Sequence, residues 1–163
     1  VIPVLTHLGI AVWIVLAIVF IITRRYRLCG ISMGAGTLTG LLVGNLILKN
    51  LLQRERPCWI NDAFELIIEN PSDYSFPSGH TLAAFITAFV VIRYSRAIGI
   101  PTLLLAMLMA FTRLYLYVHF PTDILGGIVL AAMIAVTAII LVPKAINAIT
   151  EKWNTRKTQN YQQ

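Results

Sequence analysis

A few polar side chains interrupt the apolar stretches of this sequence, and their types are those that can bind phosphate. Lys49 and Arg56, in "KNLLQRERP", are seven residues apart and share one face of a helix that Pro57 ends. Arg113 lies inside a later apolar stretch, where a cation is costly and functional by default. Three permanent cations of this kind can hold a phosphate through charge-assisted hydrogen bonds.

Two further polar groups could supply the chemistry. Ser78, Gly79 and His80, in "PSGH", open an apolar stretch. If a helix begins there, its free N–H groups and dipole favour phosphate, and Gly79 lets the backbone approach closely. His119 and Asp123, in "HFPTD", are four residues apart, so the carboxylate can hold the imidazole in one tautomer. Phosphoryl transfer needs charge stabilisation and positioning, and two histidines can supply a nucleophile and a proton donor.

The composition indicates which elements must position these residues. Of the 163 residues 58% are hydrophobic and 12% are charged, whereas soluble domains carry about 25% charged residues. Five apolar stretches cover residues 1–22, 29–48, 77–92, 97–118 and 121–142. Most reach the length of about 20 residues that a membrane-spanning helix needs, and the third is shorter. We therefore predict an all-α, polytopic membrane helix bundle, a single domain over residues 1–163 with five transmembrane segments.

The distribution of charge predicts the orientation of this bundle. Nine of the thirteen Lys and Arg residues lie in the connectors 23–28 and 93–96 and in the tail 144–163. Glu151 is the only acidic residue of these three segments. The positive-inside rule makes this side cytoplasmic. Alternating segments then bring all the polar groups described above to one extracytoplasmic face of the cytoplasmic membrane. The basic excess indicates contact with anionic lipid headgroups rather than with nucleic acid.

The start of the chain carries a further expectation. With this orientation Val1 lies outside, in a chain that opens within an apolar stretch. We expect one more N-terminal helix upstream, which would give six in the full-length protein. A cleaved signal peptide is the alternative.

The longest connector, residues 51–76 on the extracytoplasmic side, shows the periodicity of a short amphipathic helix of about three turns. Its apolar residues at helical spacing are Ile60, Ala63, Phe64, Ile67 and Ile68. Beside a membrane such a helix lies flat in the interface, with Trp59 at headgroup level. It is either an ordinary helix packed on the bundle or a gate over an opening for lipid.

Small residues recur every four positions in two of the apolar stretches. They are Gly36, Gly40 and Gly44 in one stretch, and Gly127, Ala131 and Ala135 in the other. Small residues at this spacing form a flat stripe where another helix can approach closely, so we interpret both stripes as packing surfaces.

The polar groups also resemble known motifs. "KNLLQRERP", "PSGH" and "TRLYLYVHFPTD" are similar, in this order, to K-x6-R-P, P-S-G-H and S-R-x5-H-x3-D of the type 2 phosphatidic acid phosphatase superfamily. Thr112 stands where the family usually has Ser. The resemblance implies that His119 is a nucleophile forming a phosphohistidine, that Asp123 orients it and that His80 is the general acid.

The same resemblance implies a phosphate-binding set, formed by Lys49, Arg56, Ser78, Gly79 and Arg113. We expect no metal and no other cofactor, because no His, Cys and Asp cluster has metal spacing and three cations would repel Mg²⁺. We interpret the other polar residues of the apolar stretches as structural or interfacial, namely His7, Asn45, Asn50 and Arg54.

These patterns together predict a membrane lipid phosphatase whose partners are its lipid substrate and the bilayer. Its substrate would be a phosphatidic acid, a phosphatidylglycerophosphate or an isoprenyl diphosphate such as undecaprenyl diphosphate. Two alternatives remain at this point. One is a phosphotransferase that moves phosphate between lipids, and the other is a non-catalytic lipid-phosphate binder or transporter on the same scaffold.

Overall fold

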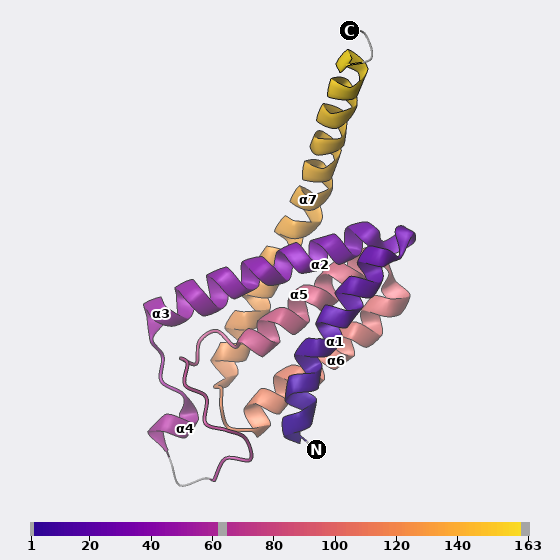
Figure 1. Cartoon of the computed structure of the whole chain (residues 1–163). Helices are drawn as coiled ribbons and strands as arrows, with labels where there is room; N and C mark the ends of the chain where they lie inside the picture. The colour runs from indigo at the N-terminus through magenta and orange to yellow at the C-terminus, as the bar shows by residue number, and fades with distance from the viewer. Residues whose placement is uncertain (1, 62–64, 161–163) are drawn as a thin grey trace.

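Helices make up all the regular structure of the part of the chain that the computed structural model describes, residues 2–61 and 65–160 (Figure 1). The helices are α1 (Ile2–Ile22), η1 (Arg24–Tyr26), α2 (Arg27–Gly40), η2 (Leu41–Leu48), α3 (Lys49–Leu52), α4 (Pro57–Ile60), α5 (Gly79–Tyr94), α6 (Arg96–Tyr115) and α7 (Pro121–Asn160). Side chains are described for residues 11–61 and 65–159. The all-α prediction is therefore confirmed.

The second apolar stretch forms one long helical rod, in which α2, η2 and α3 follow one another without a break. Its middle part, η2, has π-helical hydrogen bonding, and the rod ends at Gln53, whose φ of 46° is left-handed. The small-residue stripe of this rod faces α5. A β-carbon added at Gly40 would lie 2.7 Å from Ile86, and one added at Gly44 would lie 2.5 Å from Leu82. The interpretation of this stripe as a packing surface is confirmed.

The short helix α5 forms the centre of the bundle and packs against α2, α6 and α7. Ile86, Val90 and Val91 on α5 are fully buried. The large apolar side chains of the outer helices instead point outward, as in Leu108 of α6 and Val129 of α7. An apolar outer surface around a buried core is typical of a bundle that faces lipid.

Three helical segments are long and apolar enough to cross a membrane, judged on the described residues. They are Arg24–Ile60, Arg96–Tyr115 and Pro121–Gln159. The first and third predicted segments also form apolar helices, α1 and α5, but in the latter the helix is only 16 residues long. The prediction of five membrane-spanning segments remains a prediction.

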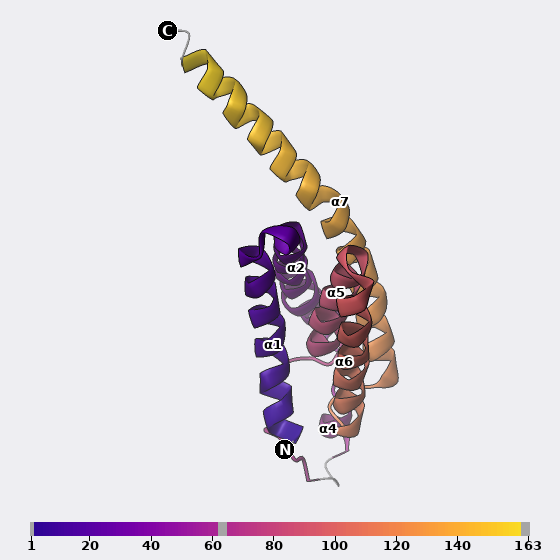
Figure 2. The same ribbon diagram turned by 90° about the vertical axis from the view of Figure 1, so that its right-hand side faces the viewer.

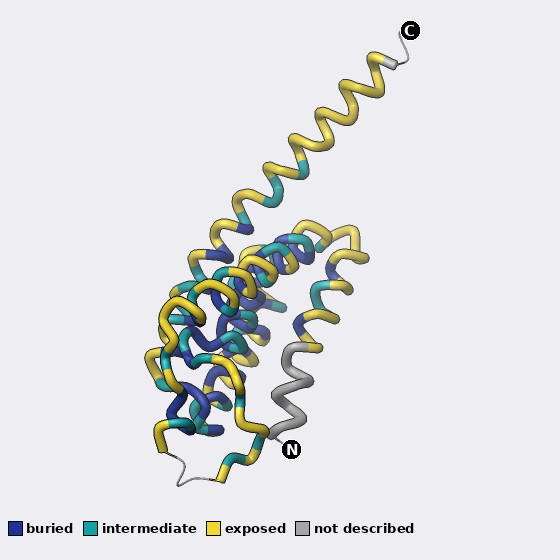
Figure 3. The backbone as a smooth tube through the Cα atoms, turned by 60° about the vertical axis from the view of Figure 1, so that its left-hand side comes forward, coloured by how far each residue is buried: buried dark blue, intermediate teal, exposed yellow. Residues whose placement is uncertain are grey.

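The two ends of the bundle differ in what they carry (Figure 2). The turn between α1 and α2 and the turn between α5 and α6 lie at one end, while α4 and the loops around it lie at the other. The last part of α7 leaves the bundle as an exposed helix (Figure 3), and its Trp153 side chain is 71% exposed. The basic connectors 23–28 and 93–96 thus lie at the end of the bundle opposite to α4 and the loops around it.

The prediction of an amphipathic helix of about three turns in the connector is wrong for the residues that the structure describes. Beyond the end of α3 at Leu52, only Pro57–Ile60 is helical among the described residues of the connector, and residues 65–78 contain no helix. Ala63 and Phe64 lie outside the described residues. The reason is that the connector folds back on itself: Trp59 Nε1 donates hydrogen bonds to Asn70 Oδ1 at 3.0 Å and to Pro71 O at 3.1 Å. Eleven residues of helix would rise about 16 Å and would keep these groups apart.

Candidate active site

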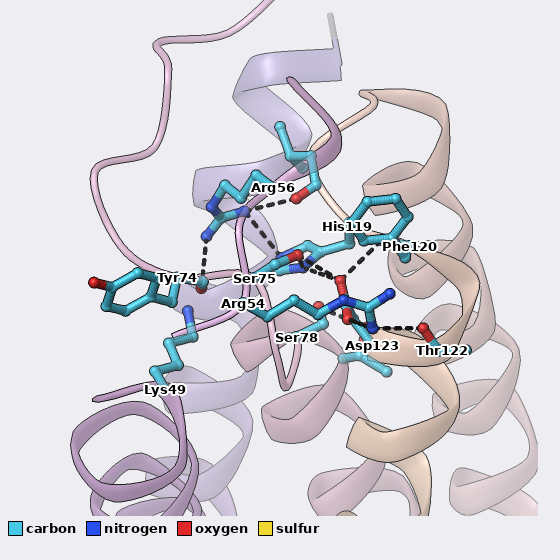
Figure 4. A network of polar contacts seen from close by, with 12 residues as sticks. Lys49, Arg54, Arg56, Tyr74, Ser75, Ser78, His119, Phe120, Thr122 and Asp123 are labelled. Carbon is cyan, nitrogen blue, oxygen red and sulfur yellow. Dashed lines mark hydrogen bonds and ion pairs between the residues drawn. The ribbon is translucent and has the colours of Figure 1, made fainter. Parts of the chain in front are cut away.

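His119 and Asp123 meet where the chain passes from α6 into α7 (Figure 4). Asp123 lies in the first turn of α7 and is fully buried, and its Oδ2 atom accepts a hydrogen bond of 2.8 Å from the backbone N–H of Phe120. His119 Nδ1 lies 3.5 Å from the same Oδ2 atom. Ser75 sits between them: its hydroxyl donates to Asp123 Oδ2 and lies 3.4 Å from His119 Nδ1. The imidazole edge that carries Nδ1 therefore faces a carboxylate and a hydroxyl.

The other ring nitrogen of His119 faces a cation. Arg56 Nη1 lies 3.3 Å from His119 Nε2 and donates a hydrogen bond of 2.8 Å to Val118 O. Because a guanidinium can only donate, this contact requires a lone pair on Nε2 and places the proton of a neutral ring on Nδ1. Burial lowers the pKa of His119 below its ordinary value, an effect that Asp123 opposes and Arg56 reinforces. The geometry therefore favours a neutral imidazole whose Nε2 lone pair points toward Arg56.

Lys49 and Arg56, at the end of the second apolar stretch, converge on one carboxylate. Lys49 Nζ and Arg56 Nη2 each bind an oxygen of Asp73, the latter at 2.6 Å. Both cationic side chains are almost fully buried, whereas the side chain of Asp73 is 55% exposed. Burial alone would raise the pKa of Asp73, but the hydrogen bond and charge of Lys49, followed by Arg56, lower it below its ordinary value. Asp73 is therefore a carboxylate that forms ion pairs with two buried cations and balances one of their two charges.

The "PSGH" residues lie at the start of α5, which begins at Gly79. Ser78 is fully buried, and its hydroxyl accepts a hydrogen bond of 3.0 Å from Thr81 Oγ1, so it does not cap the helix. The backbone of Gly79 has no left-handed φ. Gly79 is small for another reason: an added β-carbon would lie 2.8 Å from Oδ1 of Asn45. Because the Ser78 side chain does not cap α5, no capping side chain among the described residues binds the N–H groups of the first turn of this helix.

Arg113 lies in the last turn of α6 and is 2% exposed. Its guanidinium donates hydrogen bonds of 3.3 Å and 3.2 Å to the Thr112 hydroxyl, which in turn donates to Met109 O at 2.7 Å. Thr112 thus supplies an acceptor that serine could also supply, which accounts for the exchange of these residues in the third motif.

One cavity of about 900 Å³ connects most of these groups. Its lining includes six of the eight predicted site residues, namely Lys49, Arg56, Gly79, His80, Arg113 and His119. The other two, Ser78 and Asp123, are fully buried, and backbone N–H of Ser78 donates to Asp123 O at 3.3 Å. Three motifs that are up to 74 residues apart in sequence therefore meet in one place.

The comparison with protein families agrees with this geometry. The profile of the PAP2 superfamily matches residues 29–147, which contain all three motifs. The chain belongs to the PAP2 superfamily.

Several PAP2 relatives have names that specify an activity. The chain is 29% identical over 125 residues to an undecaprenyl-diphosphatase of Sulfolobus acidocaldarius, which covers 76% of this chain and 60% of the relative. It is 33% identical over 124 residues to a decaprenylphosphoryl-5-phosphoribose phosphatase of Mycobacterium tuberculosis, covering 75% and 67% of the two chains. The chain thus spans less than two thirds of the length of the first of these relatives.

Solved structures show the same fold. A transmembrane PAP2 type phosphatidylglycerolphosphate phosphatase from Bacillus subtilis superposes with a TM-score of 0.64 at 26% identity, over 91% of this chain and 76% of the other. LpxE from Aquifex aeolicus superposes with a TM-score of 0.66 at 25% identity, over 85% and 82%.

Three residues of this PAP2 site did not come out of the sequence analysis. Ser75 and Asp73 lie just before "PSGH", and a polar residue so close to a motif is the only sequence signal for them. Arg54 was interpreted as structural or interfacial, but its Nη1 atom lies 2.7 Å from Asp123 Oδ1, and its guanidinium lies 4.4 Å from the ring centre of Phe120. Its position inside "KNLLQRERP" was the available signal. Arg54 binds the Oδ1 atom of Asp123, whereas Ser75 and the backbone of Phe120 bind its Oδ2 atom.

Proposed function

We propose that this PAP2 protein hydrolyses a lipid phosphate, a monoester or a diphosphate, through a phosphohistidine on His119. The observation that carries the proposal is the contact of His119 Nε2 with Arg56 at 3.3 Å inside the cavity. A phosphorus atom next to Nε2 would lie within reach of cations that can stabilise the charge on its oxygens.

The reaction follows from the roles that the geometry supports. In the first step a bond forms between His119 Nε2 and phosphorus while the bond to the leaving oxygen breaks, and His80 gives that oxygen a proton. Asp123 stabilises the positive ring that results. In the second step His80 takes a proton from water, the water oxygen attacks phosphorus, and the bond to Nε2 breaks with release of phosphate. Lys49, Arg56 and Arg113 stabilise the charge in both steps, so the proposal involves no metal.

The cavity supports a lipid as the substrate. Beyond the polar groups its wall is formed by apolar side chains of α1, α2 and η2, namely Trp13, Ile14, Ile18, Ile21, Met33, Leu38 and Leu41. A soluble sugar phosphate would leave this wall in contact with water, whereas an acyl or prenyl chain would cover it. The names of the relatives fit the same class, since each of them refers to a lipid phosphate or diphosphate.

The charge distribution supports an extracytoplasmic site. The tail and the two basic connectors extend from the end of the bundle opposite to α4, and the positive-inside rule assigns that end to the cytoplasm. The five apolar helices then cross the membrane, and the site opens on its outer half.

Two variants test the roles of the histidines with two substrates, a lipid alkyl phosphate and an activated aryl phosphate. We expect His119→Ala to be inactive on both, because it removes the nucleophile. His80→Ala should retain much more of its activity on the aryl phosphate, because an aryl oxide leaves as a stable anion without a proton. Phosphate release is measured in detergent, with and without excess EDTA.

The same assay separates the alternatives. Activity that disappears with EDTA would refute the metal-independent mechanism, and a phosphoenzyme that still forms in His119→Ala would refute the assignment of the nucleophile. Product analysis with two lipids present distinguishes hydrolysis from transfer. A non-catalytic binder would bind lipid phosphate without releasing phosphate.

A further inference from the structure

The Asp73 carboxylate lies between two of the cations that we expect to bind the substrate phosphate, Lys49 and Arg56. It gives one oxygen to Lys49 and the other to Arg56, as two oxygens of a phosphate would do. The same guanidinium contacts His119 Nε2 through its other nitrogen, at 3.3 Å. An anion held between Lys49 and Arg56 is therefore next to the proposed nucleophile.

The surroundings of Asp73 allow its carboxylate to leave while the main chain stays in place. Arg56 Nε donates a hydrogen bond of 2.7 Å to the backbone carbonyl of Asp73, and Arg56 Nη2 contacts Tyr74 O at 3.4 Å. These contacts hold the backbone and do not depend on the side chain. The carboxylate itself is 55% exposed and lies in the wall of the cavity. A rotation of this side chain would break only two contacts, those of Lys49 Nζ and Arg56 Nη2 with the carboxylate, and would make both donors available to another anion.

The need for such an anion follows from the burial of the cations. Lys49 and Arg56 are 5% and 3% exposed, and a buried cation without a partner is strongly unfavourable. A carboxylate that pairs with both of them in the absence of substrate stabilises the empty site, and it also competes with any phosphate for the same hydrogen bonds.

We propose that Asp73 determines the affinity of the site by occupying the phosphate position and being displaced by the substrate phosphate. This inference rests on the proposed function. Substrate binding is then an exchange of one anion for another between Lys49 and Arg56. After hydrolysis the return of Asp73 displaces inorganic phosphate and so favours its release.

The test is the binding of inorganic phosphate and orthovanadate to the full chain and to Asp73→Asn, measured by titration calorimetry in detergent. We expect Asp73→Asn to bind both anions about tenfold more tightly or better, because a competing charge-assisted contact is lost. The control is Glu69→Gln, which removes the same charge from the same connector and the same cavity wall. We expect it to change the affinity less than twofold.

Weaker binding of phosphate by Asp73→Asn would indicate that Asp73 has a structural role. If Asp73 only held Lys49 and Arg56 in place, Asp73→Asn would bind phosphate more weakly, and weaker or unchanged binding would overturn the proposal. Asp73→Ser is a second variant with the same expected gain. If both variants failed to fold in a thermal unfolding assay, Asp73 would be a structural brace and the proposal would be wrong.

Lipid turnover by the unaltered chain is measured in parallel. It shows whether a negative result refutes the role of Asp73 or the hydrolase function. A chain that releases no phosphate from any lipid, yet binds phosphate more tightly after Asp73→Asn, would refute the hydrolase function but not the role of Asp73. If neither the unaltered chain nor Asp73→Asn bound phosphate or turned over lipid, both the hydrolase function and the role of Asp73 would be refuted.

Discussion

Replacing Ser75 by alanine tests how the site holds its nucleophile. The Ser75 hydroxyl donates to Asp123 Oδ2 and lies 3.4 Å from His119 Nδ1, so it connects the carboxylate to the ring. Ser75 is fully buried, so we expect no water molecule to take the place of the lost hydroxyl. Ser75→Ala therefore leaves Asp123 with one donor fewer and His119 with a weaker constraint on its orientation.

The expected size of the effect follows from the kind of hydrogen bond. A hydrogen bond to a charged group contributes about 1.5–3 kcal/mol, and each 1.36 kcal/mol changes a rate about tenfold. If this energy is lost mainly when the ring becomes positive, kcat falls roughly 10- to 150-fold. KM should change less than about threefold, because the cations that hold phosphate are untouched.

The assay is steady-state phosphate release from a lipid monoester in detergent, with the phosphoenzyme trapped by acid quenching. The control is Ser72→Ala, three residues away in the same connector and exposed at the cavity wall, for which kcat should stay within twofold. A Ser75→Ala variant with the kcat of the unaltered chain, or one in which only KM rises, would refute the reasoning that Ser75 acts through Asp123 and His119.

Two other predictions concern packing and pH. A β-carbon at Gly30 would lie 2.6 Å from the backbone N of Ile21, whereas one at Gly34 meets nothing within 4 Å. In thermal unfolding we expect Gly30→Ala to destabilise by about 1–3 kcal/mol and Gly34→Ala to be neutral or slightly stabilising; equal effects would contradict the close contact of α1 with α2. Burial lowers the pKa of His119, so the ring should stay neutral as the pH falls below the ordinary histidine value of 6.5. In a ¹⁵N-histidine NMR titration, with His119→Ala used for assignment, a midpoint above 6.5 would contradict this.

The sequence was most informative where the physical constraint is local. A helix that begins at "PSGH", a histidine four residues before a carboxylate and a stripe of glycines each follow from spacing along one element. Six of the eight predicted site residues line one cavity, because alternating helices bring their ends to the same face of the bundle. The assignments of roles within this set, such as His119 as nucleophile and His80 as acid, remain predictions.

What the sequence missed has a common physical cause. Periodicity in the connector predicted a helix, but the contacts of Trp59 with Asn70 and Pro71 fold this segment back instead. Long-range contacts of this kind leave no periodic signal, because they depend on residues that are distant in sequence and not on the spacing of neighbouring residues. The same folding presents Asp73 to Lys49 and Arg56, and Ser75 to Asp123. The irregular part of the connector thus supplies two side chains of the site, and no periodic pattern marks either of them.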